Sequence, residues 1–232
     1  MNFIYFLLFS IIVFMLSLVC YEKFRATTLY ALAIGGAVNA NFFHAGKYPI
    51  MCLGLPFGID SIIYSLFAYC VIIMFLKVNK REAYILTFSS VIAIMFSALM
   101  QLIAELFIIG SCFAVWKTFI NFFVSSVASL IAMSVMLEIL NKLKKKNFNE
   151  YFLLIIAMLI VSLLNSLIYY TIVTWINGAP ENIITLLLTS FIGKAIALIC
   201  ALGALYLTNK IEKIIKIHNT SKQSLENSEK NK

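Results

Sequence analysis

The stretch that decides the fold is IITLLLTSFIGKAIALICALGALYLT, residues 183–208. It is apolar throughout and carries one charge, Lys194, near its middle. At about 1.5 Å per residue, a helix of this length crosses a hydrocarbon layer of about 30 Å. An ammonium group at that depth costs about 2.5 to 3.5 kcal/mol on insertion scales, so it nearly always faces a bundle interior, a partner or a cavity. We therefore expect other helices to place polar groups at the depth of Lys194.

The composition predicts an integral membrane protein. The chain has 232 residues, of which 62% are hydrophobic and 12% charged, and its mean hydropathy is +0.98. Soluble domains are far more polar. The net charge of +8 fits the charge asymmetry of membrane topology and contact with anionic lipid. No nucleic-acid partner is expected, because no basic patch is interleaved with aromatic residues.

Apolar runs predict seven transmembrane helices, at residues 3–20, 26–43, 57–76, 83–109, 118–140, 151–176 and 183–208. The predicted fold class is therefore an all-α integral membrane protein, a seven-helix bundle forming a single domain over residues 1–208. Glycines and prolines in the connection Ala45–Pro56 predict irregular or re-entrant backbone there. Residues 209–232 are polar and charged, which predicts a disordered tail.

The basic residues predict the orientation of the bundle. They gather in the connections after the first, third and fifth helices and in the tail, whereas the opposite side holds only Lys47 and Lys117. By the positive-inside rule, the amino terminus lies outside and the carboxyl terminus in the cytoplasm of a cell that carries the protein in its cell membrane. At the cytoplasmic rim, Glu138 is expected to pair with Lys142, four residues further along the same helix.

In this orientation, scattered polar residues fall in the outer half of the bundle. They are Asn39, Asn41, Asp60, Gln101, Glu105 and Asn165, with Lys194 at the inner edge of the same zone. The sixth helix also places Ser162, Asn165, Ser166 and Tyr169 on one face. We expect these residues to line a cavity open to the outside that binds a small polar solute.

Other interpretations of these residues stay open. Asp60 and Glu105 could be interfacial carboxylates that reach water, and one of them could pair with Lys194 only to permit insertion. Asn165 could make an interhelical hydrogen bond worth about 0.6 kcal/mol. Gly35 and Gly36 predict close helix packing.

Catalysis, metal binding and cofactor binding find no support in the sequence. It has no nucleotide-binding glycine loop, no Gly-x-Ser-x-Gly elbow and no His-Glu-x-x-His motif. The five cysteines are scattered and form no Cys-x-x-Cys pair, so they predict neither disulfides nor a metal site. We expect a protein that is not an enzyme and has no cofactor.

Four short motifs resemble the queuosine precursor transporter family, also called the vitamin uptake transporter family. They are Ala40-Asn41 followed by Lys47, NKREA (79–83), VSLLNSLIYYT (161–171), similar to the family's Ser-Gln-x-x-Asp-Thr-x-x-Phe helix, and SFIGKAIAL (190–198), similar to the lysine-bearing start of its last helix. The resemblance implies a secondary carrier that imports a purine-like base of the 7-deazaguanine precursor class. It also adds Lys47 to the candidate binding residues.

The chain departs from the family at two acidic positions. The family's acidic segment in the third helix is replaced by VIIMFLKV (71–78), and its aspartate in the sixth helix is matched by Asn165. The chain therefore either recognises a different solute or has lost part of the family's function. The alternative hypothesis is a non-transporting membrane protein, such as a substrate-binding subunit of a multi-component importer, an immunity protein or an accessory sensor.

Overall fold

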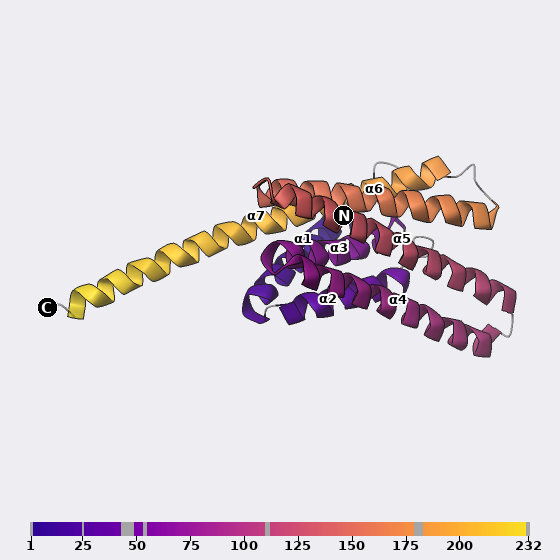
Figure 1. Ribbon diagram of the computed structural model, residues 1–232, viewed down its shortest axis with the longest axis horizontal. Coiled ribbons are helices and arrows are strands. Elements are labelled where there is room, and N and C mark those ends of the chain that lie inside the picture. The colour runs from indigo at the N-terminus through magenta and orange to yellow at the C-terminus, as the bar shows by residue number, and fades with distance from the viewer. Residues whose placement is uncertain are drawn as a thin grey trace.

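The computed structural model describes residues 2–24, 26–42, 49–52, 55–109, 112–178 and 183–230. These residues form seven helices and one short hairpin (Figure 1). The elements are α1 (Asn2–Phe24), α2 (Ala26–Phe42), β1 (Pro49–Cys52), β2 (Leu55–Gly58), α3 (Ile59–Lys77), α4 (Lys80–Ile109), α5 (Cys112–Lys144), α6 (Glu150–Asn177) and α7 (Ile183–Lys230).

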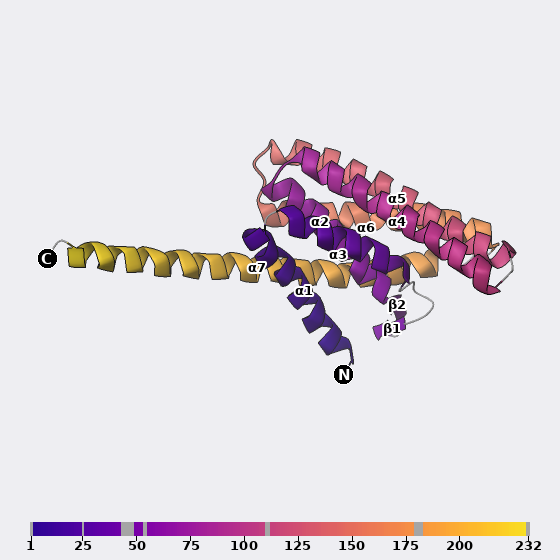
Figure 2. The ribbon, with the colours of Figure 1, turned by 90° about the horizontal axis from the view of Figure 1, so that it is seen from below.

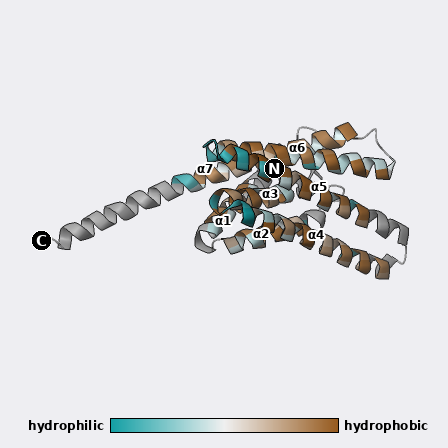
Figure 3. Cartoon of the chain, in the orientation of Figure 1, coloured by the Kyte–Doolittle hydropathy of each residue, from teal (hydrophilic) through white to brown (hydrophobic). Residues whose placement is uncertain are grey.

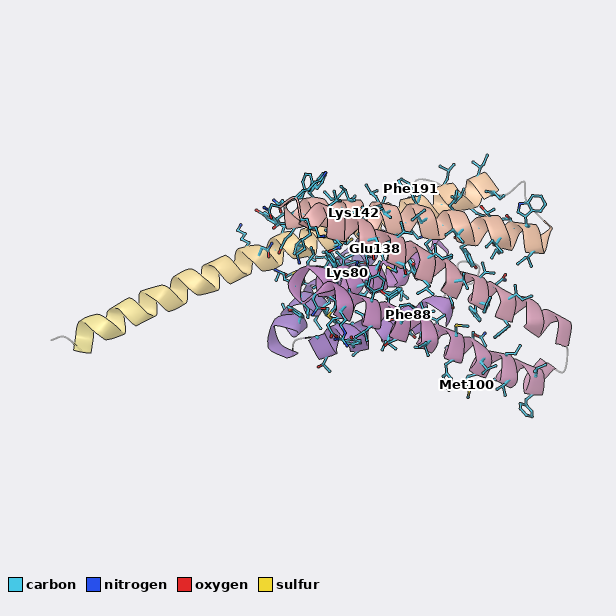
Figure 4. All side chains as sticks on the ribbon, viewed as in Figure 1. Lys80, Phe88, Met100, Glu138, Lys142 and Phe191 are labelled. Atoms are coloured by element: carbon cyan, nitrogen blue, oxygen red, sulfur yellow. The ribbon has the colours of Figure 1, made fainter. Side chains whose placement is uncertain are left out.

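The helical bundle predicted from the apolar runs is confirmed. Within the described residues, four helices are long and apolar enough to cross a membrane, at Lys80–Ala104, Phe119–Lys144, Glu150–Ile176 and Ile183–Lys210. Shorter apolar helical segments occur at Ser10–Val19 and Ile63–Lys77. The structure therefore has the helices of a membrane protein. Apolar side chains that face outward, such as Phe88 and Met100 on α4 and Phe191 on α7 (Figure 4), suit contact with lipid tails.

The connection between α2 and α3 contains a hairpin that the all-α prediction did not include. β1 and β2 pair antiparallel, with Ile50 opposite Phe57 and Met51 opposite Pro56. Figure 2 shows the hairpin on the lower side of the bundle, away from the extension of α7. Proline is tolerated in it because both strands are edge strands. The sequence predicted irregular or re-entrant backbone here, since two short strands leave little periodic signal.

The predicted disordered tail is not what the structure shows, because α7 continues as a helix to Lys230. Figure 1 shows this part of α7 extending away from the other helices. Residues 209–230 contain neither glycine nor proline and are rich in lysine, glutamate and isoleucine. Such residues continue a helix at little cost once it has been nucleated inside the bundle.

Helix α3 lies at the centre of the bundle. Every side chain from Phe67 to Phe75 is buried, and a helix that is apolar and buried on all sides is a core helix. It packs against α2, α4, α6 and α7. Side chains at the amino-terminal end of α3 can therefore reach residues of several other helices.

At one end of the bundle, polar contacts join helices that are distant in sequence. Lys80 Nζ lies 2.7 Å from Glu138 Oε1, and the Tyr84 hydroxyl donates to the same oxygen at 2.8 Å (Figure 4). The ion pair of Glu138 is thus with Lys80 of α4 and not with the predicted Lys142, whose charge adds only a weaker attraction. The reason is tertiary: the start of α4 packs beside the end of α5, so Glu138 meets a lysine from another helix.

Further contacts complete what we call the basic end, residues 77–81, 142–150 and 209–210. Lys77 lies 3.5 Å from Glu150, Lys144 donates to the carbonyl oxygen of Leu76 at 3.1 Å, and Asn209 donates to the Tyr151 hydroxyl at 2.8 Å. Figure 3 shows hydrophilic residues gathered at this end. These are the segments that the charge pattern assigned to a single side of the membrane.

Candidate functional site

Lys194 lies inside the bundle, as its position in the sequence predicted. Its side chain is only 5% exposed. The ammonium group donates a hydrogen bond to Ser166 Oγ of α6 at 2.5 Å, and it lies 5.4 Å from the centre of the Tyr64 ring of α3. An ammonium within about 6 Å of an aromatic face is attracted by the ring's quadrupole. Two other helices therefore contribute to holding this charge in place.

A pair of buried serines extends the site from Lys194. Ser166 and Ser190 have their hydroxyl oxygens 3.0 Å apart, and both side chains are buried. Because an ammonium can only donate hydrogen bonds, Ser166 accepts from Lys194, and either serine can be the donor in the bond between Ser166 and Ser190. The three side chains form a connected chain of hydrogen bonds between α6 and α7.

Asn165 lies next to Ser166 in α6 and is also buried. Its Oδ1 is 3.4 Å from the hydroxyl of Ser129 in α5, and that hydroxyl also lies 2.7 Å from the carbonyl oxygen of Ser125. A serine has one proton to donate, and the shorter contact with Ser125 takes it. The amide oxygen of Asn165 therefore retains capacity to accept a hydrogen bond from another group.

These polar residues lie close in depth in the bundle, with Ser190 one helical turn further from the basic end than Lys194. We call them the Lys194 cluster: Tyr64, Ser129, Asn165, Ser166, Ser190 and Lys194. Counted along α3, α5, α6 and α7 at about 1.5 Å per residue, Tyr64, Ser129, Ser166 and Lys194 lie about 20 to 24 Å from the basic end. If a hydrocarbon layer of about 30 Å began at the basic end, this depth would be beyond its midplane.

Two of the other predicted residues lie elsewhere. Asn39 is exposed on α2, and its amide donates to the carbonyl oxygen of Gly35 at 2.8 Å, within its own helix. Gln101 is partly exposed on α4, about 31 Å from the start of that helix. In the described part of the chain, α4 packs against α2, α3 and α5. The structure therefore does not bring Asn39 or Gln101 to Lys194.

The remaining predicted residues have side chains outside the described part of the structure. Asn41 belongs to α2, Asp60 to α3 and Glu105 to α4, and Lys47 lies in the undescribed connection. Asp60 precedes Tyr64 by four residues in α3, which places the two positions on the same helix face.

Sequence reasoning missed Tyr64, Ser129 and Ser190 as members of the cluster. Ser190 precedes Lys194 by four residues, so the helical spacing could have identified it. Ser129 gave no separate signal, because a small residue in an apolar run is typical of close helix packing. Tyr64 gave no signal, because a tyrosine within an apolar run is typical of a packed core and only the contact between α3 and α7 brings it to Lys194.

The cluster offers an ammonium group, hydroxyls, one amide and an aromatic face, which are binding groups for a polar solute. Among the described residues, no three His, Cys, Asp or Glu side chains gather to hold a metal ion. Comparison of the chain with protein-family models, with curated proteins and with solved structures finds no match.

Proposed function

We propose that this chain is a membrane carrier that imports a small polar, purine-like solute of the 7-deazaguanine precursor class. The observation that carries the proposal is the convergence of Lys194, Ser166 and Asn165, from two helices, in the interior of an apolar bundle. Buried charged and polar groups at membrane depth are costly and mark solute or ion pathways. The resemblance of four motifs to queuosine precursor transporters points to the same class of function.

The groups of the cluster match the chemistry of such a base. A purine-like ring has a flat face, carbonyl and ring-nitrogen acceptors and amino donors. Lys194 and the serines can donate to the acceptors, and the amide of Asn165 can both accept and donate. The Tyr64 ring offers an aromatic surface for an offset or edge contact with the base.

In this proposal the protein crosses the cell membrane seven times, with the amino terminus outside and the basic end in the cytoplasm. The support is the concentration of lysine and arginine at that end. The Lys194 cluster then lies in the outer half of the bilayer, where a solute arriving from outside would reach it first. Asp60, Glu105, Asn41 and Lys47 remain candidates for the entry to this site.

Uptake by purified protein in proteoliposomes tests the proposal. A radiolabelled 7-deazaguanine base should accumulate inside the vesicles above the level in protein-free vesicles, and imposed proton or sodium gradients should show which ion, if any, drives it. A matched reconstitution with Lys194→Met should lose most of the uptake. Binding of the base without any uptake would favour the alternative, a substrate-binding subunit. If the protein neither binds nor takes up the base, the proposed solute is refuted.

A further inference from the structure

The hydroxyl of Tyr64 is buried within the Lys194 cluster. Tyr64 is 9% exposed, and its hydroxyl has no hydrogen-bond partner among the described residues. The Ser129 hydroxyl lies in its vicinity, but it makes no hydrogen bond of good geometry with Tyr64 and gives its proton to Ser125. Buried hydroxyls in proteins are nearly always paired, because a lost hydrogen bond with water is costly.

The position of this phenol is fixed by packing on both sides. The Tyr64 ring lies beside the Lys194 ammonium, 5.4 Å from its centre, and meets the Phe67 ring edge to face with centres 5.7 Å apart. The phenol is therefore held at the depth of Asn165 and Ser166. A phenylalanine would fill the same space without burying an unpaired hydroxyl, so packing does not explain the oxygen.

A second tyrosine of α3 provides an internal comparison. Tyr69 is fully buried, and its hydroxyl also has no hydrogen-bond partner in the described part of the chain. Its ring packs edge to face on Phe14 of α1, with centres 5.0 Å apart. Five residues along a helix turn the side chain to a different face, and it is the Tyr64 ring that lies beneath the Lys194 ammonium.

We propose that the Tyr64 hydroxyl binds the solute directly and determines which solutes the Lys194 cluster accepts. The inference rests on the proposed function, since it assigns a ligand to the same site. A phenol can donate to a carbonyl oxygen or ring nitrogen of the base and accept from an amino group. Such a bond gives the buried hydroxyl a partner in the bound state. Analogues that lack the matching atom are then rejected, because their binding leaves the phenol unpaired.

The test compares Tyr64→Phe with Tyr69→Phe, which removes the same atom from the same helix. Equilibrium binding of a 7-deazaguanine base, and of its analogue without the exocyclic oxygen, is measured on purified protein at equal folded amounts. Tyr64→Phe should weaken binding of the base about tenfold or more. It should also reduce the difference in binding affinity between the base and the analogue. Thermal stability should be unchanged or raised in both variants, and Tyr69→Phe should bind like wild type.

Each other result overturns the inference in a recognisable way. One such result is that wild type binds the base and Lys194→Met weakens this binding, but Tyr64→Phe leaves it unchanged. The inference then fails while the proposed function stands. Equal losses in Tyr64→Phe and Tyr69→Phe would make the effect structural. No binding of the base by wild type would remove the proposed solute and, with it, the role assigned to Tyr64.

Discussion

Replacing Lys194 with methionine is expected to weaken solute binding about thirtyfold or more while the protein still folds. Truncating one partner of a buried charged hydrogen bond costs about 2 to 5 kcal/mol, and each 1.4 kcal/mol is a factor of about ten in affinity. Methionine is of similar length and removes the cost of burying an ammonium. Ser166, which loses its donor, keeps its contact with Ser190. The measurement is equilibrium binding to wild type and variant at equal folded amounts.

Asn165→Ala serves as a graded comparison for the lysine variant. It should weaken binding in the same direction but less, because a neutral hydrogen bond is worth about half of one to a charged group. Unchanged affinity in Lys194→Met would make the lysine a structural charge. In that case a double variant with Asp60→Asn should regain any stability lost by Asp60→Asn alone, as expected for a pair that exists only to permit insertion.

Replacing Gly36 with leucine is expected to destabilise the bundle by about 1 to 3 kcal/mol, the usual cost of overpacking. A Cβ atom added at Gly36 would lie 3.5 Å from the carbonyl oxygen of Ile63 and 3.9 Å from the backbone nitrogen of Phe67. Alanine therefore fits, but a longer side chain runs into the backbone of α3. Folded yield and thermal unfolding in detergent measure the effect, and Gly36→Ala should behave like wild type.

Gly35→Leu is the matched control for this variant. A Cβ atom at Gly35 meets nothing within 4 Å. Both leucines gain the same helix propensity over glycine, so the difference between the two variants isolates the packing of α2 on α3. Because Ile63 precedes Tyr64, Gly36→Leu should also weaken solute binding in the protein that still folds. Equal stability of the two leucine variants would contradict the close packing assigned to Gly36.

The helices could be predicted because apolar runs of membrane length leave little choice of structure. The run around Lys194 shows this: its length predicts a spanning helix, and the cost of burying an ammonium predicts that the side chain turns inward. The structure has both features. The hairpin at Pro49–Gly58 escaped prediction because strands of four residues give no reliable period.

The site was predicted less completely. The sequence gives the depth of a residue along its helix, but not whether its side chain faces other helices or the outside of the bundle. Asn39 and Asn165 look alike as polar residues in apolar runs, yet Asn39 is exposed on α2 and Asn165 is buried between helices. Only the packing of α6 on α5 and α7 separates the two cases. Glu138 shows the same limit, since helical spacing favoured Lys142 and the fold supplied Lys80.

Photoaffinity labelling tests the central claim, that the Lys194 cluster is the solute site, most directly. An azido derivative of the 7-deazaguanine base is photoactivated on wild-type protein in proteoliposomes, and the labelled residues are mapped by mass spectrometry. We predict labels on the segments of α3, α6 and α7 around Tyr64, Asn165 and Lys194, abolished by excess unmodified base. Labels on α4 around Gln101 that excess unmodified base prevents would contradict this assignment of the site.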